Sequence, residues 1–207
     1  MRKKDGTDHP LERLVFFSDA VFAIAITLLV IEIEIPHLDG NTATAWTALW
    51  HLAPSFFGFV LSFLVIGRFW IGHHNAFTMI DHYDGRLAWP NMLLLMLIAL
   101  MPFATAFMSA NLGQLVPTLF YNLVLLATAC LSRWVIGIGT SPDLLRAGAD
   151  PAVIALLRAR GMGVVLGALT AVAVTFVSPQ FSQIALATIP LWQRLLNKRS
   201  AARNAIT

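Results

Sequence analysis

The chain has 207 residues, of which 57% are hydrophobic and 12% are charged, and its formal net charge is +3. Soluble domains contain about 45–50% apolar and about 25% charged residues, so a soluble core could not bury this many apolar side chains. The composition excludes an ordinary soluble domain and indicates a chain that uses lipid as the solvent for much of its surface. Its one cysteine, Cys130, excludes an intrachain disulfide framework.

Six segments are apolar for long enough to cross a bilayer, which requires roughly 20 mostly apolar residues. They predict an all-α polytopic protein that forms a single membrane domain over residues 1–207. The six predicted spans are Leu14–Ile35, Trp46–Gly72, Leu87–Ser109, Leu115–Gly139, Gly161–Ser178 and Phe181–Leu196. The last two are the shortest and could form one hairpin broken at Ser178-Pro179, because the residue before a proline leaves the helical region.

All 14 Lys and Arg residues fall on one side of a six-span arrangement. They lie at the two chain ends, between the second and third spans, and between the fourth and fifth, where Pro151–Arg160 is predicted as a short cytoplasmic helix. The connections 36–45, 110–114 and 178–180 contain no Lys or Arg. Because cytoplasmic loops carry the excess of positive charge, this pattern predicts that both termini are cytoplasmic.

The first predicted span contains a carboxylate within its apolar run. Asp19 lies about one and a half turns inside the span and is followed by twelve uncharged residues. An unpaired charge inside a bilayer costs a few kcal/mol, so such a residue marks either function or a structural network. Arg13 and Ser18 are near enough in sequence to help satisfy it. Anchoring of the helix end is the favoured interpretation, and direct ion contact or proton relay is the alternative.

The same span carries a stripe of residues on one helical face, at positions i, i+3, i+4 and i+7: Ile24, Thr27, Leu28 and Ile31. In a single bundle this stripe would be ordinary packing. Around an axis shared by several copies it would form rings of branched aliphatic side chains with one hydroxyl layer, which can gate by excluding water and replace part of an ion's hydration shell. Glu32 and Glu34 would then concentrate cations at the outer mouth, or they only mark the membrane interface.

Two other patterns admit a functional and a structural interpretation. The residues His73, His74, Asp81, His82 and Asp84 are of metal-binding type but lack tight ligand spacing, so a buried histidine network beside a cytoplasmic turn is favoured over a metal or proton-sensing site. The Gly163-Val-Val-Leu-Gly167 sequence is a close-packing motif, which we expect to dock helices within one subunit.

The string Arg13-x-x-x-Phe17-Ser18-Asp19 resembles the signature of the transmembrane protein 175 potassium channels. The following run, 20–30, is similar to the pore helix of that family. Further similarities lie at Trp70-Ile-Gly-His73-His74 in the second span and at Asn91 and Pro102-Phe103 in the third. The resemblance covers about half of the chain, because the last three spans carry nothing diagnostic.

The resemblance implies a homotetramer of six-helix subunits in a bacterial plasma membrane, with the first helix lining a central pore. It implies that Ile24 forms the constriction and that Thr27 helps to favour potassium, with further layers at Leu28 and Ile31. The signature residues would be structural and would hold the first helix against its neighbours: Arg13, Phe17, Ser18, Asp19, Trp70, His73 or His74, and Asn91.

These observations together predict a potassium-selective channel that conducts passively, with a hydrophobic constriction and a threonine layer in place of a carbonyl filter. The alternative is a small secondary cation transporter, against which the absence of matching broken helices in two halves counts. A membrane-embedded enzyme or a scaffold is a third possibility, but no hydrolase elbow, P-loop or metalloprotease motif is present, so no enzyme is predicted. The expected partners are copies of the chain, membrane lipid and permeant monovalent cations, with no nucleic acid, no metal site and no cofactor besides permeant K⁺.

Overall fold

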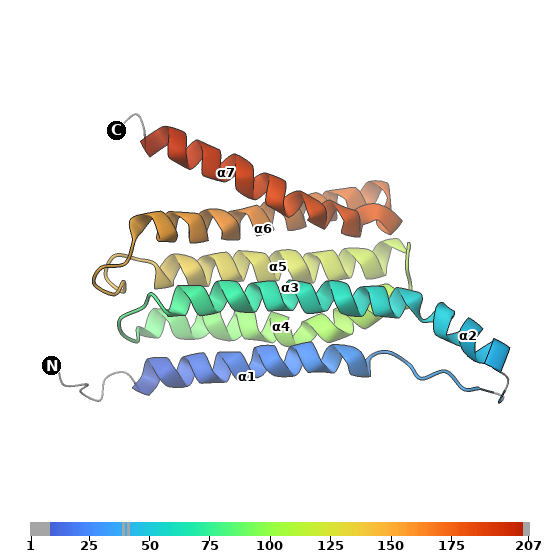
Figure 1. Cartoon of the computed structure of the whole chain (residues 1–207). Coiled ribbons are helices and arrows are strands. Elements are labelled where there is room, and N and C mark those ends of the chain that lie inside the picture. The colour runs from blue at the N-terminus through green and yellow to red at the C-terminus, as the bar shows by residue number, and fades with distance from the viewer. Residues whose placement is uncertain (1–8, 39, 41, 205–207) are drawn as a thin grey trace.

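The computed structural model describes residues 9–38, 40 and 42–204. In chain order its helices are α1 (His9–Ile31), α2 (Thr42–His51), α3 (Ala53–Phe77), η1 (Gly85–Leu87), α4 (Ala88–Ser109), α5 (Leu115–Gly139), α6 (Pro151–Val177), η2 (Pro179–Thr188) and α7 (Ile189–Asn204). The long helices lie side by side, and the start of α1 and the end of α7 are at the same end of the bundle (Figure 1).

Five helical stretches within the described residues are long and apolar enough to cross a membrane. They are Pro10–Ile31, Ala53–Phe77, Gly85–Ser109, Leu115–Gly139 and Pro151–Val177. The protein is therefore an all-α membrane protein, as predicted, and the fourth predicted span has the observed bounds of α5. Arg2, Lys3 and Lys4, which contributed to the charge pattern, lie outside the described residues.

The sixth predicted span, Phe181–Leu196, was wrong as a single α-helix. Its first part belongs to the 3-10 helix η2, and α7 then returns along α6 (Figure 1). Buried polar side chains tie η2 to α5, because Ser182 and Gln183 of η2 hydrogen-bond with Asn122 of α5 at 3.3 Å each. These bonds hold η2 inside the bundle, so the chain returns to its starting end in two helical pieces.

The second predicted span is also divided. Residues 42–51 form α2, which projects beyond the other helices in Figure 1, and a new helix begins at Ala53. Pro54 lies in the first turn of α3, where its missing N–H and fixed φ are tolerated, but it could not have continued a helix from α2. In contrast, Pro151–Arg160 is the first part of α6 itself, capped by the Asp150 side chain, which accepts from the Ala152 N–H at 2.8 Å.

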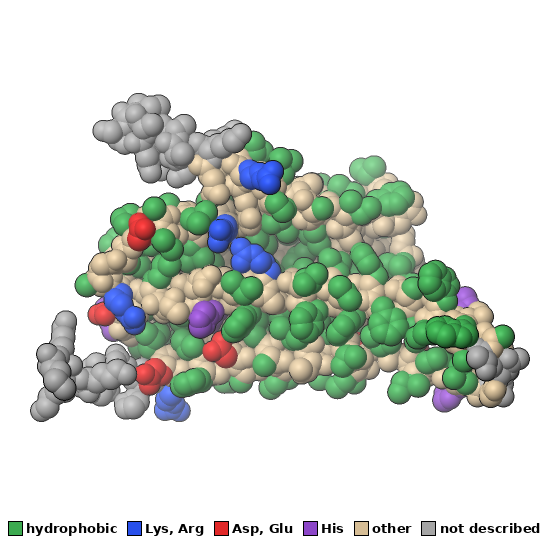
Figure 2. Space-filling model, in the orientation of Figure 1, with side chains coloured by type: hydrophobic (Ala, Val, Ile, Leu, Met, Phe, Trp, Pro, Cys, Tyr) green, Lys and Arg blue, Asp and Glu red, His purple; other side chains and the backbone are tan. Residues whose placement is uncertain are grey.

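The core lies between α1, α3, α4 and α5. Its largest fully buried side chains include Phe22, Ile66, Ile98, Met101 and Tyr121. Outside this core the helices present apolar side chains to their surroundings, as Figure 2 shows over much of the visible face. Such a surface is stable only against lipid or another protein chain.

Candidate functional site: helix α1 and its polar network

Helix α1 has two faces with different surroundings. The side chains of Ser18, Phe22, Ala25 and Leu29 are between 0% and 2% exposed and follow one another at helical spacing. The opposite stripe faces outward, with Ile24 57%, Leu28 39% and Ile31 73% exposed, and Thr27 is exposed between them. Within one subunit, the predicted pore stripe is therefore not packing against the core.

Two adjacent polar residues connect the inner side of α1 to two different helices. Ser18 Oγ accepts a hydrogen bond from Asn91 Nδ2 of α4 at 2.9 Å and donates to the Leu14 carbonyl at 2.8 Å. The Asp19 carboxylate accepts from Trp70 Nε1 of α3 at 2.8 Å. Because Ser18 and Asp19 both find hydrogen-bond partners on neighbouring helices, they stabilise the arrangement of α1, α3 and α4.

The buried histidine of this network is His73. Its Nε2 lies 2.9 Å from Asn91 Oδ1, and because the Asn91 amide nitrogen donates to Ser18, the histidine Nε2–H is the donor. The ring stacks on Phe77 with centroids 4.1 Å apart. Its Nδ1 is buried and has no partner within the described residues. His74 is exposed and contacts the Trp70 ring with centroids 5.6 Å apart.

Four other predicted residues lie outside this network. Arg13 and Phe17 are on the exposed side of α1, and Arg13 has no hydrogen-bond or ion-pair partner in the part of the chain that the structure describes. The first span was predicted to continue to Ile35, but α1 ends at Ile31, so Glu32 and Glu34 follow the helix in a non-helical segment, where both are exposed. They follow the last residue of α1, whereas Asp19 lies near the middle of the helix.

The Thr27 hydroxyl donates within its own helix. Its Oγ1 lies 2.9 Å from the Ile24 carbonyl and 3.2 Å from that of Ala23. A hydroxyl has one donor and two acceptor lone pairs. With the proton directed at the backbone, the lone pairs are available on the exposed face of the helix.

Two buried polar clusters were missed in the sequence. In one, Thr105 Oγ1 donates to Ser62 Oγ at 2.7 Å, and Ser62 Oγ lies 3.1 Å from the Tyr121 hydroxyl. In the other, Asn122 Nδ2 donates to Thr175 Oγ1 at 2.8 Å, next to the η2 contacts described above. Each is marked in the sequence by an isolated polar residue inside an apolar helix, which is the signal that identified Asp19.

The Asp84 and Arg86 side chains form an ion pair at the end of the bundle where α1 begins. Arg86 Nη2 lies 2.8 Å from Asp84 Oδ2 and also pairs with Asp143 of the α5–α6 connection. Hydrogen bonds from the Arg86 guanidinium and backbone N–H hold the pKa of Asp84 below its usual range. His82 lies 3.9 Å from Asp81, and no group of three or more His, Cys, Asp or Glu in the described residues is placed to hold a metal ion.

The sequence matches the model of a family described as the endosomal/lysosomal potassium channel TMEM175 over residues 13–102. That stretch contains the outward stripe of α1 and every hydrogen-bonded side chain of the α1–α3–α4 network. A potassium channel of Streptomyces collinus is 41% identical over 121 residues, and one of Chryseobacterium sp. is 32% identical over 117 residues. Each alignment covers 56% of this chain and 58% of the relative, so the chain spans little more than half the length of the curated relatives it matches.

Solved structures resemble the whole fold. The crystal structure of a lysosomal potassium-selective channel TMEM175 homolog from Chamaesiphon minutus has a TM-score of 0.76 and 29% identity, covering 91% of this chain and 99% of that one. A second structure, of the potassium channel MtTMEM175, has a TM-score of 0.59 over 94% of both chains at 16% identity. At that identity the second comparison shows a shared fold alone.

Proposed function

We propose that the chain, which is similar to the TMEM175 potassium channels, forms a passive potassium-selective pore lined by α1 from four copies of the subunit. The observation that carries this proposal is the stripe of α1, which faces out of the subunit while the opposite side is hydrogen-bonded to α3 and α4. Four such stripes around an axis would make layers of aliphatic side chains with one layer of hydroxyls.

In this pore the narrowest layer is formed by Ile24. Branched aliphatic side chains in a ring exclude water from a narrow passage and so oppose ion flow until the ring widens. Thr27 lies almost one turn further along the helix and offers oxygen lone pairs to an ion that has lost part of its hydration shell. Leu28 and Ile31 continue the apolar wall, and Glu32 and Glu34 raise the local cation concentration at the far mouth.

The relatives support the choice of ion. The Streptomyces and Chryseobacterium proteins are described as potassium channels, and the Chamaesiphon homolog as potassium-selective. We place the end of the bundle with the start of α1 in the cytoplasm of a bacterial plasma membrane, because the basic residues gather at that end.

The test is ion flux through purified protein in liposomes. A passive channel carries potassium down its gradient without an energy source and carries it faster than sodium. Flux that requires a proton gradient, or that saturates as a carrier does, would reject the proposal. The oligomer mass in detergent should equal four chains.

Substitution at Ile24 tests the constriction. Ile24→Asn places a polar amide in the proposed ring, so conductance should rise and selectivity should change. Val30→Asn is the matched control, because Val30 is 53% exposed on the same helix but lies about 120° away from Ile24 at 100° per residue. Equal effects of the two substitutions, or no current in either form, would show that the stripe does not line the pore.

Substitution at Thr27 tests the hydroxyl layer. Thr27→Val keeps the shape and removes the oxygen, so the preference for potassium over sodium should weaken while the tetramer mass is unchanged. Thr27→Ser keeps the oxygen and should retain the preference. If the serine and valine variants lose selectivity to the same extent, an oxygen at this layer has no role in choosing the ion.

A further inference from the structure

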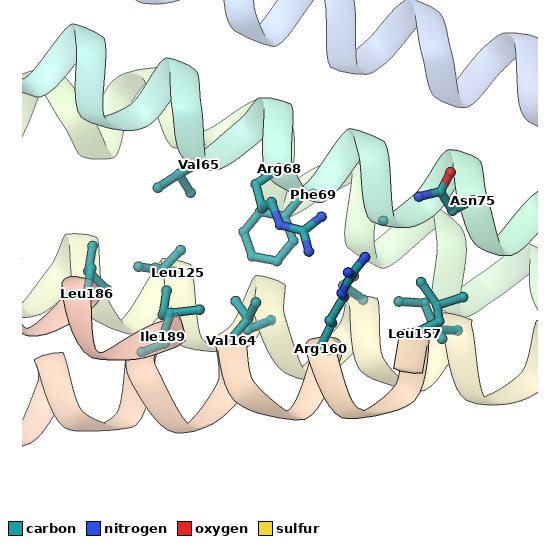
Figure 3. A pocket seen from close by; sticks show the side chains of 16 residues that line it. Val65, Arg68, Phe69, Asn75, Leu125, Leu157, Arg160, Val164, Leu186 and Ile189 are labelled. Carbon is teal, nitrogen blue, oxygen red and sulfur yellow. The ribbon is translucent and has the colours of Figure 1, made fainter. Parts of the chain in front are cut away.

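A half-open groove lies on the side of the subunit between α3 and α6, with α5 as its floor (Figure 3). Its cavity volume is about 80 Å³. The wall is mostly aliphatic and aromatic, with small residues such as Gly72, Ala129 and Gly161 leaving room beside them. The larger apolar side chains along it are Val65, Phe69, Leu125, Val164, Leu186 and Ile189.

Two arginines from different helices meet across this groove. In Figure 3, Arg68 of α3 and Arg160 of α6 point toward each other from opposite walls. Both side chains are exposed, and neither has an acidic or hydrogen-bonding side-chain partner among the described residues. Figure 2 shows basic side chains in the hollow between α6 and α3, on the open face of the molecule.

Both arginines lie well inside their helices and not at the helix ends. Arg68 lies nine residues before the end of α3, which is about 14 Å along the axis at 1.5 Å per residue. Arg160 lies equally far from the start of α6. An unpaired charge is costly wherever lipid surrounds it, and two cations that face each other also repel. The site is therefore complementary to an anion.

We propose that this groove binds an anionic phospholipid from the leaflet at the α1-start end, with its phosphate between Arg68 and Arg160 and one acyl chain along the apolar wall. Guanidinium groups bind phosphate oxygens through paired, charge-assisted hydrogen bonds. Basic pockets between membrane helices are suited to anionic headgroups. The aliphatic wall beyond Arg68 selects a lipid over a soluble anion, because a free phosphate would leave that wall without a partner.

The experiment measures lipid retention by native mass spectrometry of the purified oligomer. Phosphatidylglycerol, phosphatidylcholine with the same acyl chains, and inorganic phosphate are added separately. We expect phosphatidylglycerol to remain bound and the other two to be lost. The variant Arg68→Gln/Arg160→Gln should bind phosphatidylglycerol roughly 25-fold more weakly, since each arginine near a membrane surface contributes on the order of a fivefold increase in affinity.

Two further variants separate the proposal from general effects of charge or folding. Arg146→Gln/Arg194→Gln removes the same charge from exposed positions outside the groove and should bind phosphatidylglycerol as the wild type does. Val164→Trp fills the groove, keeps both arginines and should also lose the lipid. Because binding is measured without ion flow, the result is independent of whether the protein conducts potassium.

Several outcomes would overturn the proposal. Equal retention of phosphatidylcholine would show that the headgroup charge is not recognised. Retention of inorganic phosphate alone would show that the groove binds a soluble anion. Dissociation of the oligomer in the arginine double variant, with no change in lipid bound per chain, would show that another copy of the subunit covers the groove. Unchanged phosphatidylglycerol binding in both the arginine double variant and Val164→Trp would place the lipid elsewhere.

Discussion

The hydrogen bond from Trp70 to Asp19 gives a quantitative test of the α1 network. Trp70→Phe keeps an aromatic ring beside His74 but removes the indole N–H, whose nitrogen lies 2.8 Å from the Asp19 carboxylate, together with part of the ring area. Side-chain hydrogen bonds between membrane helices contribute about 0.6 kcal/mol on average and at most about 1.7. A bond to an ionised group is roughly twice as strong as a neutral one. We therefore expect a coupling free energy of about 1 kcal/mol.

The assay is a double-mutant cycle on the free energy of unfolding. Wild type, Trp70→Phe, Asp19→Ala and the double variant are unfolded by sodium dodecyl sulfate in mixed micelles, and the coupling is the departure from additivity. Trp89→Phe is the matched control, because Trp89 is 76% exposed and has no side-chain hydrogen bond within the described residues. Trp89→Phe should change the free energy of unfolding by less than about 0.5 kcal/mol.

Two results would refute the reasoning about this bond. Additive effects of Trp70→Phe and Asp19→Ala would mean that the two side chains do not stabilise each other in the membrane. An equal loss of stability in Trp89→Phe would mean that removal of any indole accounts for the effect. Asp19→Ala should also reduce the yield of the proposed tetramer, because it removes the hydrogen bond between α1 and α3.

Three more outcomes follow from the described contacts. Asn91→Leu removes both bonds made by the amide and leaves His73 without its partner, so the free energy of unfolding in the same assay should fall by about 2–4 kcal/mol. Gly167→Leu forces a side chain into Ile189 of α7 and should expose the end of the chain to limited proteolysis. The lowered pKa of Asp84 means that its ion pair with Arg86 stabilises the loop fully above the unfolded pKa of about 4, and that this stabilisation is lost as the pH falls through the lower pKa of the folded state. Hydrogen exchange at residues 84–87 should rise in acid for the wild type and change less with pH in Asp84→Asn.

The sequence predicted that Ile24, Thr27 and Leu28 share one face of α1, but not whether that face packs inside the subunit or faces outward. The spacing of Ile24, Thr27 and Leu28 requires only helical geometry. Both sides of α1 are apolar, so hydrophobicity does not distinguish the side that contacts α3 and α4 from the side that faces outward. Ser18 distinguishes them, because a buried hydroxyl needs a partner and the structure provides Asn91.

Helical geometry also decides which of His73 and His74 joins the buried network. Adjacent residues on a helix point about 100° apart, so one of them had to lie outside the network. Ser62, Ile66, Phe69 and His73 are all buried and follow one another at intervals of four, three and four residues. That periodicity places His73 on the inner face of α3, and it was available in the sequence once the face containing Ser62 was known.

The change from α-helix to 3-10 helix in η2 could not be predicted from its own residues. Residues 181–196 are apolar enough to suggest a span. In the structure, however, the Gln183 amide donates to Asn122 and the Asn122 amide donates to Ser182, and Asn122 lies about 60 residues earlier in the chain. The glycines of α6 pack against another helix of the same subunit, as predicted. A Cβ at Gly163 would meet the Gln193 backbone at 3.2 Å, so only a glycine allows α7 to pack this closely.

Polar bonds, not apolar packing, fix the rotation of α1. Lipid tails are as apolar as leucine side chains, so burial of apolar area gives a membrane helix little reason to prefer one rotation over another. Ser18 and Asp19 point about 100° apart and bond to α4 and α3 respectively, so a turn of α1 about its own axis breaks at least one bond. Ile24, Thr27 and Ile31 lie on the same rigid helix, one to three turns further on. Two hydrogen bonds near the middle of α1 thereby determine which of its side chains face out of the subunit.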